Sequence, residues 1–146
     1  MTRAFELLCK YEQAEEERNS NWRRITSKVN EILLGFDKYL NDGGSAVATV
    51  KLGVNIASGF NELSVDKFRY EDDESLSFAL LVSLNKASRV VVEDVLSLSC
   101  VRYHAGFIVK IEGGVDDIIV GGYMSDDTEL FEAMYKVLES KFVNYM

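Results

Sequence analysis

The stretch AVATVKLGVNI, residues 46–56, marks the point at which the chain changes from a helical to an extended pattern. The apolar positions recur at every second residue, as Ala46, Ala48, Val50, Leu52, Val54 and Ile56. A period of two places alternate side chains on opposite faces of a strand. The stretch therefore predicts a half-buried strand over 46–56.

The segment before this strand, residues 2–41, has the period of a helix. Its large side chains recur at spacings of three and four, as Trp22, Ile25, Val29, Ile32, Phe36 and Tyr39. Extended backwards, the same register reaches Leu8 and Tyr11 but places Glu15 and Arg18 at the apolar positions between them and Trp22. The pattern predicts an amphipathic helical segment whose apolar stripe is interrupted by a polar waist.

The polar waist leaves two helical arrangements open. Either two helices cover about 2–18 and 20–41, or one long helix runs through the waist and ends near Asp42 and the glycines that follow. A continuous helix of about forty residues would be ~60 Å long. A compact domain of this size has a radius of gyration of only ~15 Å. The helix either folds back at the waist or projects from the domain and meets a partner.

The segment after residue 56 alternates again in several places. It predicts, in order, a weaker strand over 62–70 with a bulge, a strand over 76–84, a strand over 90–103, and a hairpin of 107–111 with 118–120. The chain has no proline, so Gly, Asn, Asp and Ser must make the turns. The pattern is typical of an antiparallel meander of four to six strands.

The last segment predicts a C-terminal helix over 125–146. Ser125 and Asp126 offer N-caps, and Glu129 stands three residues after Asp126 as in a capping box. Asp127 suits the positive end of the helix dipole. An apolar stripe follows, made of Leu130, Phe131, Met134, Val137, Leu138 and Phe142.

Together these elements predict a single α+β domain over 1–146. A helical segment (1–42) precedes an antiparallel sheet (43–124), and the C-terminal helix (125–146) covers one sheet face. No stretch approaches the roughly 20 apolar residues of a membrane span. Charged residues interrupt the only candidate leader, around Leu7 and Leu8. We expect a cytoplasmic protein.

The charge of the chain is strongly negative and uneven. Sixteen Lys and Arg stand against 24 Asp and Glu, which gives a net charge of −8. Residues 43–146 carry −7 of it. Such a surface favours a protein partner with a basic surface and argues against direct binding to nucleic acid or an anionic membrane. Cys9 and Cys100 have no cysteine neighbours at metal or redox spacing, and we expect two buried free thiols.

No motif in the sequence indicates a catalytic, cofactor-binding or metal site. His104, the only histidine, has no recognisable nucleophile nearby and is expected at a turn. The pairs of adjacent aspartates do not have the spacing of a calcium loop, and the glycine pairs lack phosphate-binding spacing. A basic cluster of Arg18, Arg23, Arg24 and Lys28 stands beside acidic residues, which is typical of a solvated helix face.

The sequence favours a non-enzymatic protein-binding module. One version is an acidic inhibitor of viral or mobile-element type that blocks a basic or nucleic-acid-binding surface. Its predicted contacts are the four consecutive acids Glu71, Asp72, Asp73 and Glu74. A homodimeric adaptor or chaperone is the first alternative. The second is a small enzyme or ligand-binding domain with a pocket between helices and sheet, near Tyr103 and His104.

Overall fold

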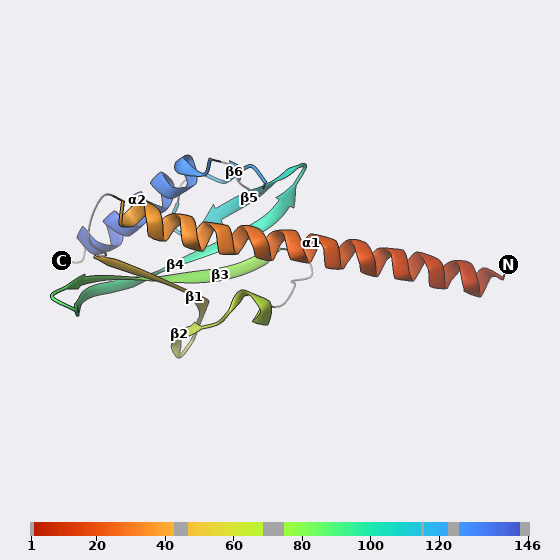
Figure 1. The fold of residues 1–146 in the computed structure, drawn as a ribbon, viewed down its shortest axis with the longest axis horizontal. Coiled ribbons are helices and arrows are strands. Elements are labelled where there is room, and N and C mark those ends of the chain that lie inside the picture. The colour runs from red at the N-terminus through yellow and green to blue at the C-terminus, as the bar shows by residue number, and fades with distance from the viewer. Residues whose placement is uncertain (1, 43–46, 69–74, 115, 123–125, 144–146) are drawn as a thin grey trace.

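The protein has two helices and one six-stranded antiparallel sheet, as a computed structural model shows (Figure 1). The structure describes residues 2–42, 47–68, 75–114, 116–122 and 126–143. The C-terminal helix contacts the sheet, and the predicted α+β class is confirmed. Neither helix is long and apolar enough to cross a membrane, within the residues that the structure describes.

The N-terminal segment is one continuous helix, α1 (Arg3–Leu40), so the alternative of two helices is wrong. The Thr2 hydroxyl accepts a hydrogen bond from the Phe5 N–H at 3.2 Å and caps its start. The polar waist changes the surface of the helix but does not break its backbone, because residues 3–34 contain neither glycine nor proline. The second half of α1 lies on the sheet, and the first half projects away from it (Figure 1).

The sheet has the strand order β2-β1-β3-β4-β5-β6. Its strands are β1 (Ala48–Ile56), β2 (Gly59–Glu62), β3 (Leu76–Lys86), β4 (Arg89–Tyr103), β5 (Gly106–Ile111) and β6 (Ile118–Val120). The turn between β3 and β4 is made by Ala87 and Ser88, which both have positive φ. Two such residues form the tight turn that matches the twist of a hairpin.

The predicted strand over 62–70 is wrong in its described part, and residues 69 and 70 lie outside the residues that the structure describes. The second strand, β2, comes earlier and pairs with β1 from Gly59 to Glu62, whereas Val65–Lys67 form a short 3-10 helix. Glycine allows this close hairpin: a Cβ at Gly53 would lie 2.0 Å from the Asn61 carbonyl oxygen. Gly59 has a φ of +119°, which other residues rarely adopt. The sequence pattern did not show this turn because the alternation in β1 runs directly into it.

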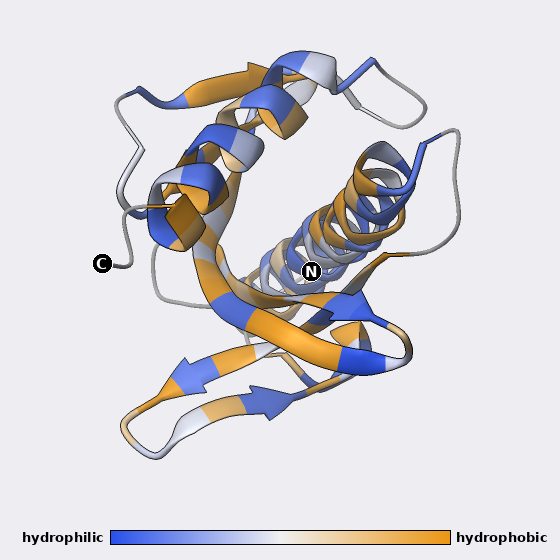
Figure 2. Cartoon of the chain, turned by 90° about the vertical axis from the view of Figure 1, so that its left-hand side faces the viewer, coloured by the Kyte–Doolittle hydropathy of each residue, from blue (hydrophilic) through white to orange (hydrophobic). Residues whose placement is uncertain are grey.

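The core lies between the sheet and the two helices, α1 and α2 (Thr128–Val143), which share one face of the sheet (Figure 2). The alternate residues of β1, β3, β4 and β5 form its sheet side, as the period of two predicts. Fully buried members from the helices and the middle strands include Ile25, Val29, Ile32, Phe36, Leu80, Val82, Leu96, Val109, Leu130 and Met134.

Candidate functional site

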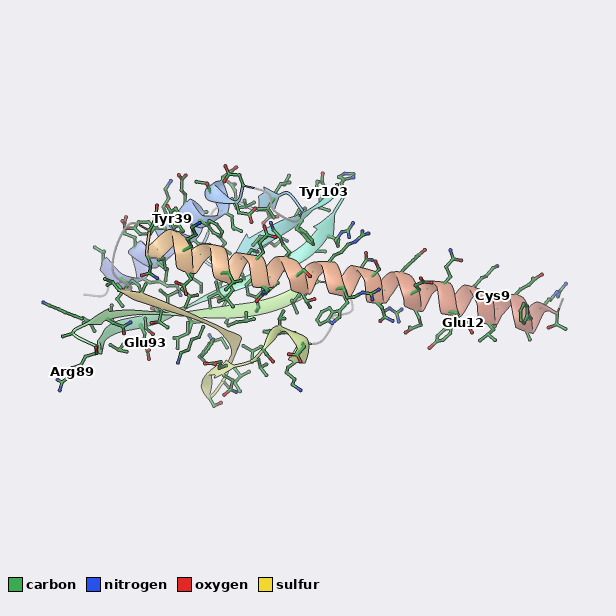
Figure 3. The ribbon with its side chains drawn as sticks, viewed as in Figure 1. Cys9, Glu12, Tyr39, Arg89, Glu93 and Tyr103 are labelled. Carbon is green, nitrogen blue, oxygen red and sulfur yellow. The ribbon has the colours of Figure 1, made fainter. Side chains whose placement is uncertain are left out.

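The projecting half of α1 exposes large apolar side chains. Leu7 is 70% exposed and Tyr11 62%, and Phe5 and Leu8 are each about half exposed. Cys9 and Glu12 lie on the same projecting half, far from the sheet (Figure 3). Such a concentration of exposed apolar side chains is a common sign of an interaction surface.

These side chains follow the spacing of a helix that docks into a groove. Ala4, Leu7, Leu8 and Tyr11 stand at positions i, i+3, i+4 and i+7, so they share one side of the helix. Four acidic residues follow directly at positions 12, 15, 16 and 17. We call the apolar side chains of Ala4, Phe5, Leu7, Leu8 and Tyr11 the tip patch.

The two cysteines differ in environment, which corrects the expectation that both are buried. Cys9 lies exposed on the projecting helix, and Cys100 is buried in β4. Burial raises the pKa of the Cys100 thiol to about 12, and the positive charge of Lys28 opposes this rise in part. The helical pattern around residue 9 indicated an apolar face, but the structure provides nothing to cover it within the described residues.

The packed half of α1 carries a buried ion pair. The Lys28 Nζ lies 2.7 Å from the Asp127 Oδ2, and the two side chains are 1% and 3% exposed. The Lys28 Nζ also lies 3.5 Å from the Glu31 Oε1 and donates to the Gly122 carbonyl at 3.4 Å. The pair therefore joins α1 to the start of α2 across 99 positions of sequence.

This ion pair corrects one sequence prediction: Lys28 does not belong to a solvated helix face. Asp127 stands directly before α2, as expected, and its carboxylate pairs with Lys28. Asp126, one of the two predicted N-caps, makes contacts at the helix start: its Oδ1 accepts from the Thr128 N–H at 3.0 Å and from the Thr128 hydroxyl. These bonds, the hydroxyl's first, lower the pKa of the Asp126 carboxyl. The other predicted N-cap, Ser125, lies outside the described residues. The two partners of the ion pair could not be matched from sequence, because only the fold brings them together.

A cavity of about 490 Å³ opens beside the buried lysine, between α1 and the β4–β5 hairpin. Arg23, Arg24 and Lys28 line it from the helix, and Arg102 lines it from β4. The first three belong to the basic cluster that the sequence shows on this helix. Arg102 could not be predicted, because no local signal shows that the end of β4 faces α1.

His104 lies in the turn between β4 and β5, as predicted. It is exposed and has a φ of +53°, and its ring stands 4.4 Å from that of Tyr103. Its carbonyl accepts a hydrogen bond from Arg102 at 3.2 Å. The turn thus holds the guanidinium of Arg102, and His104 has no carboxylate partner among the described residues.

The predicted acidic contacts Glu71, Asp72, Asp73 and Glu74 lie outside the residues that the structure describes. Of the adjacent acidic pairs, Asp117 lies 3.9 Å from the Lys110 Nζ, and Asp126 and Asp127 have the separate roles given above. In the described ranges, no group of three or more His, Cys, Asp or Glu is placed to hold a metal ion.

Similarity to other proteins gives no assignment for this arrangement. No family model matches the chain, and no curated protein or solved structure matches it significantly.

Proposed function

We propose that this protein is a non-enzymatic binding module that docks the projecting half of α1 into an apolar groove of a partner protein. The observation that carries the proposal is the exposure of the tip patch on a helix that extends beyond the domain. Residues 3–20 span about 27 Å at 1.5 Å per residue. Most of the stability of a protein helix comes from the packing of its apolar face, so contact with a partner would stabilise this half of α1.

The charge of the projecting half supports a partner with a basic rim. Residues 2–20 carry five acidic and three basic side chains, and the acids at positions 15, 16 and 17 stand next to one another. The Arg18 guanidinium pairs with the Glu15 carboxylate at 2.6 Å. Glu12, Glu16 and Glu17 have no ion pair with any described residue. A groove with apolar walls and basic edges complements this pattern.

Two Leu-to-Glu variants test the role of the tip patch. Leu7 lies in the patch and is 70% exposed, whereas Leu34 is 63% exposed on the packed half of the same helix. A partner captured from the native host's cells and then purified is titrated with the wild type and with each variant. We expect Leu7→Glu to weaken binding at least about tenfold, because it places a charge in an apolar groove. Leu34→Glu should bind like the wild type.

Sedimentation of the protein alone separates this proposal from the homodimer. A dimer at micromolar concentration that Leu7→Glu dissociates and Leu34→Glu does not would overturn the proposal in favour of a homodimeric adaptor. Equal binding of the purified partner by both variants would also overturn it. A peptide of residues 2–21 that competes for the partner would support it.

The acidic-inhibitor version adds a second contact through Glu71, Asp72, Asp73 and Glu74. If it holds, replacing all four by their amides should weaken binding, and the effect should shrink at high salt. The captured partner should also lose its nucleic acid when the protein binds. A partner that binds nucleic acid and this protein together would exclude this version while leaving docking of the helix in place.

A further inference from the structure

The cavity beside Lys28 combines cationic and apolar walls in a way that the projecting helix does not explain. Arg23 and Arg24 reach it from α1, Arg102 reaches it from β4, and Phe107 forms part of its apolar wall. The Arg102 guanidinium carbon lies 5.8 Å from the centre of the Phe107 ring. Its volume of about 490 Å³ is within the range of small-molecule sites.

The three guanidiniums have N–H donors left for a ligand, although one N–H of Arg102 donates to the His104 carbonyl. None of Arg23, Arg24 and Arg102 forms an ion pair with a carboxylate in the described part of the chain. Counting Lys28, the site has four cationic side chains, against the carboxylates of Glu31 and Asp127. A local charge of +2 thus stands in a chain of net charge −8. A dianion would neutralise it, and guanidinium groups bind phosphate oxygens in pairs.

Glu31 supplies a second indication of a ligand. Its Oε1 lies 3.5 Å from the Lys28 Nζ, but its Oε2 is buried and has no hydrogen-bond partner among the described residues. A buried carboxylate oxygen without a donor is costly. Because Glu31 lines the cavity, a ligand hydroxyl there would supply the missing donor.

We propose that this cavity binds a small hydroxyl-bearing phosphate monoester, of the sugar-phosphate class. The phosphate would lie among Arg23, Arg24 and Arg102, and a hydroxyl would donate to the Glu31 Oε2. The carbon side of the ligand would pack on Phe107. Lys28 lines the site, and its ion pair with Asp127 keeps the start of α2 against α1.

Calorimetric titration with ribose 5-phosphate tests the site, with inorganic phosphate and ribose as the two half-ligands. At low ionic strength we expect ribose 5-phosphate to bind at least about tenfold tighter than either half-ligand, which corresponds to one added charge-assisted hydrogen bond. Arg102→Ala, and separately the double variant Arg23→Ala/Arg24→Ala, should each weaken it at least about tenfold. Thermal melting of each variant confirms that it is folded.

Arg89→Ala is the matched control, because it removes the same charge from the opposite end of β4 (Figure 3). It should leave the affinity unchanged. Glu31→Leu should tighten inorganic phosphate, because it removes a repelling charge, and should abolish the advantage of ribose 5-phosphate over phosphate. Equal weakening by Arg89→Ala and Arg102→Ala, or no binding of ribose 5-phosphate to the wild type, would overturn the proposal.

Discussion

The two halves of α1 show what an apolar stripe on a helix does and does not specify. In the packed half, Ile25, Val29 and Ile32 are fully buried against the sheet. In the projecting half, Leu7 and Tyr11 are mostly exposed, although both halves belong to the same uninterrupted helix. The difference lies in the rest of the chain, which provides strands to cover one half and nothing, among the described residues, to cover the other. A helical period thus predicts which side is apolar but not what covers it.

The largest expected effect is a difference in the reactivity of the two cysteines, because Cys9 lies on the exposed half of α1 and Cys100 lies in the core. Native protein treated with an aromatic disulfide reagent at neutral pH should react quickly at one thiol, Cys9. Cys100 should react far more slowly, because its pKa of about 12 leaves about 10³-fold less thiolate at neutral pH than the ordinary pKa of 9.0, and because the thiol is buried. Cys9→Ser should abolish the fast reaction, and denaturant should expose the second thiol. Fast reaction of two thiols in native protein would contradict the burial of Cys100.

The raised pKa of Cys100 also predicts a loss of stability at high pH. Between about pH 9 and pH 12 the thiol stays protonated in the folded protein but deprotonates in the unfolded chain. The unfolded chain then binds fewer protons, so the free energy of unfolding falls as the pH rises. From pH 9 to pH 11 the loss is about 2 kcal/mol. Urea denaturation at several pH values measures the free energy of unfolding of the wild type and of Cys100→Ala, and the difference between them should shrink by this amount. The same pH dependence in both proteins would refute the prediction.

Two lysines, one on each half of α1, should differ in how much they contribute to the free energy of unfolding. Lys28→Ala should lower the free energy of unfolding by about 3–5 kcal/mol, because it leaves Asp127 buried without its ammonium partner. Lys10→Ala, on the exposed half, should change it by less than about 0.5 kcal/mol. Urea denaturation measures both. The double variant Lys28→Ala/Asp127→Ala should recover part of the loss. If Lys28→Ala were as stable as Lys10→Ala, the buried pair would not be formed.

The smallest effect is expected at the polar waist. The Glu15–Arg18 pair is short, at 2.6 Å, but the two side chains are 38% and 55% exposed. A double-mutant cycle with Glu15→Ala and Arg18→Ala should give a coupling of only about 0.2–1 kcal/mol, and less at high salt. A coupling as large as that of the buried pair would mean that the waist is covered in solution, which would point to self-association.

Much of the fold follows from local pattern. The alternation in β1, β3 and β4 and the stripe of α2 predict their type and most of their extent, because each buries one side against a single core. The strand over 62–70 fails because its apolar residues, Leu63, Val65 and Phe68, pack on the core from a 3-10 turn and loop. Apolar spacing alone does not distinguish such a segment from an irregular strand.

The candidate sites were predictable only in part. The helical register through Leu8 and Tyr11 indicated an apolar stripe on the first half of α1, and the cluster around Arg23 and Arg24 indicated positive charge. Neither Arg102 nor Asp127 carries a local signal of its role, since each meets α1 only after the sheet has folded. Long-range pairs of this kind depend on topology, which the period of a segment does not contain.

Because α1 is rigidly packed along its second half, the phase of the helix fixes the direction in which the tip patch faces relative to the cavity. One residue inserted near Asn19 would turn the patch by about 100° around the helix axis. Seven inserted residues would restore its direction to within about 20° and move it outward by about 10 Å. The number of residues between Tyr11 and Arg23 thus sets the direction of the tip patch around the helix axis. An insertion or deletion in this segment would turn the patch even if every side chain of the patch were unchanged.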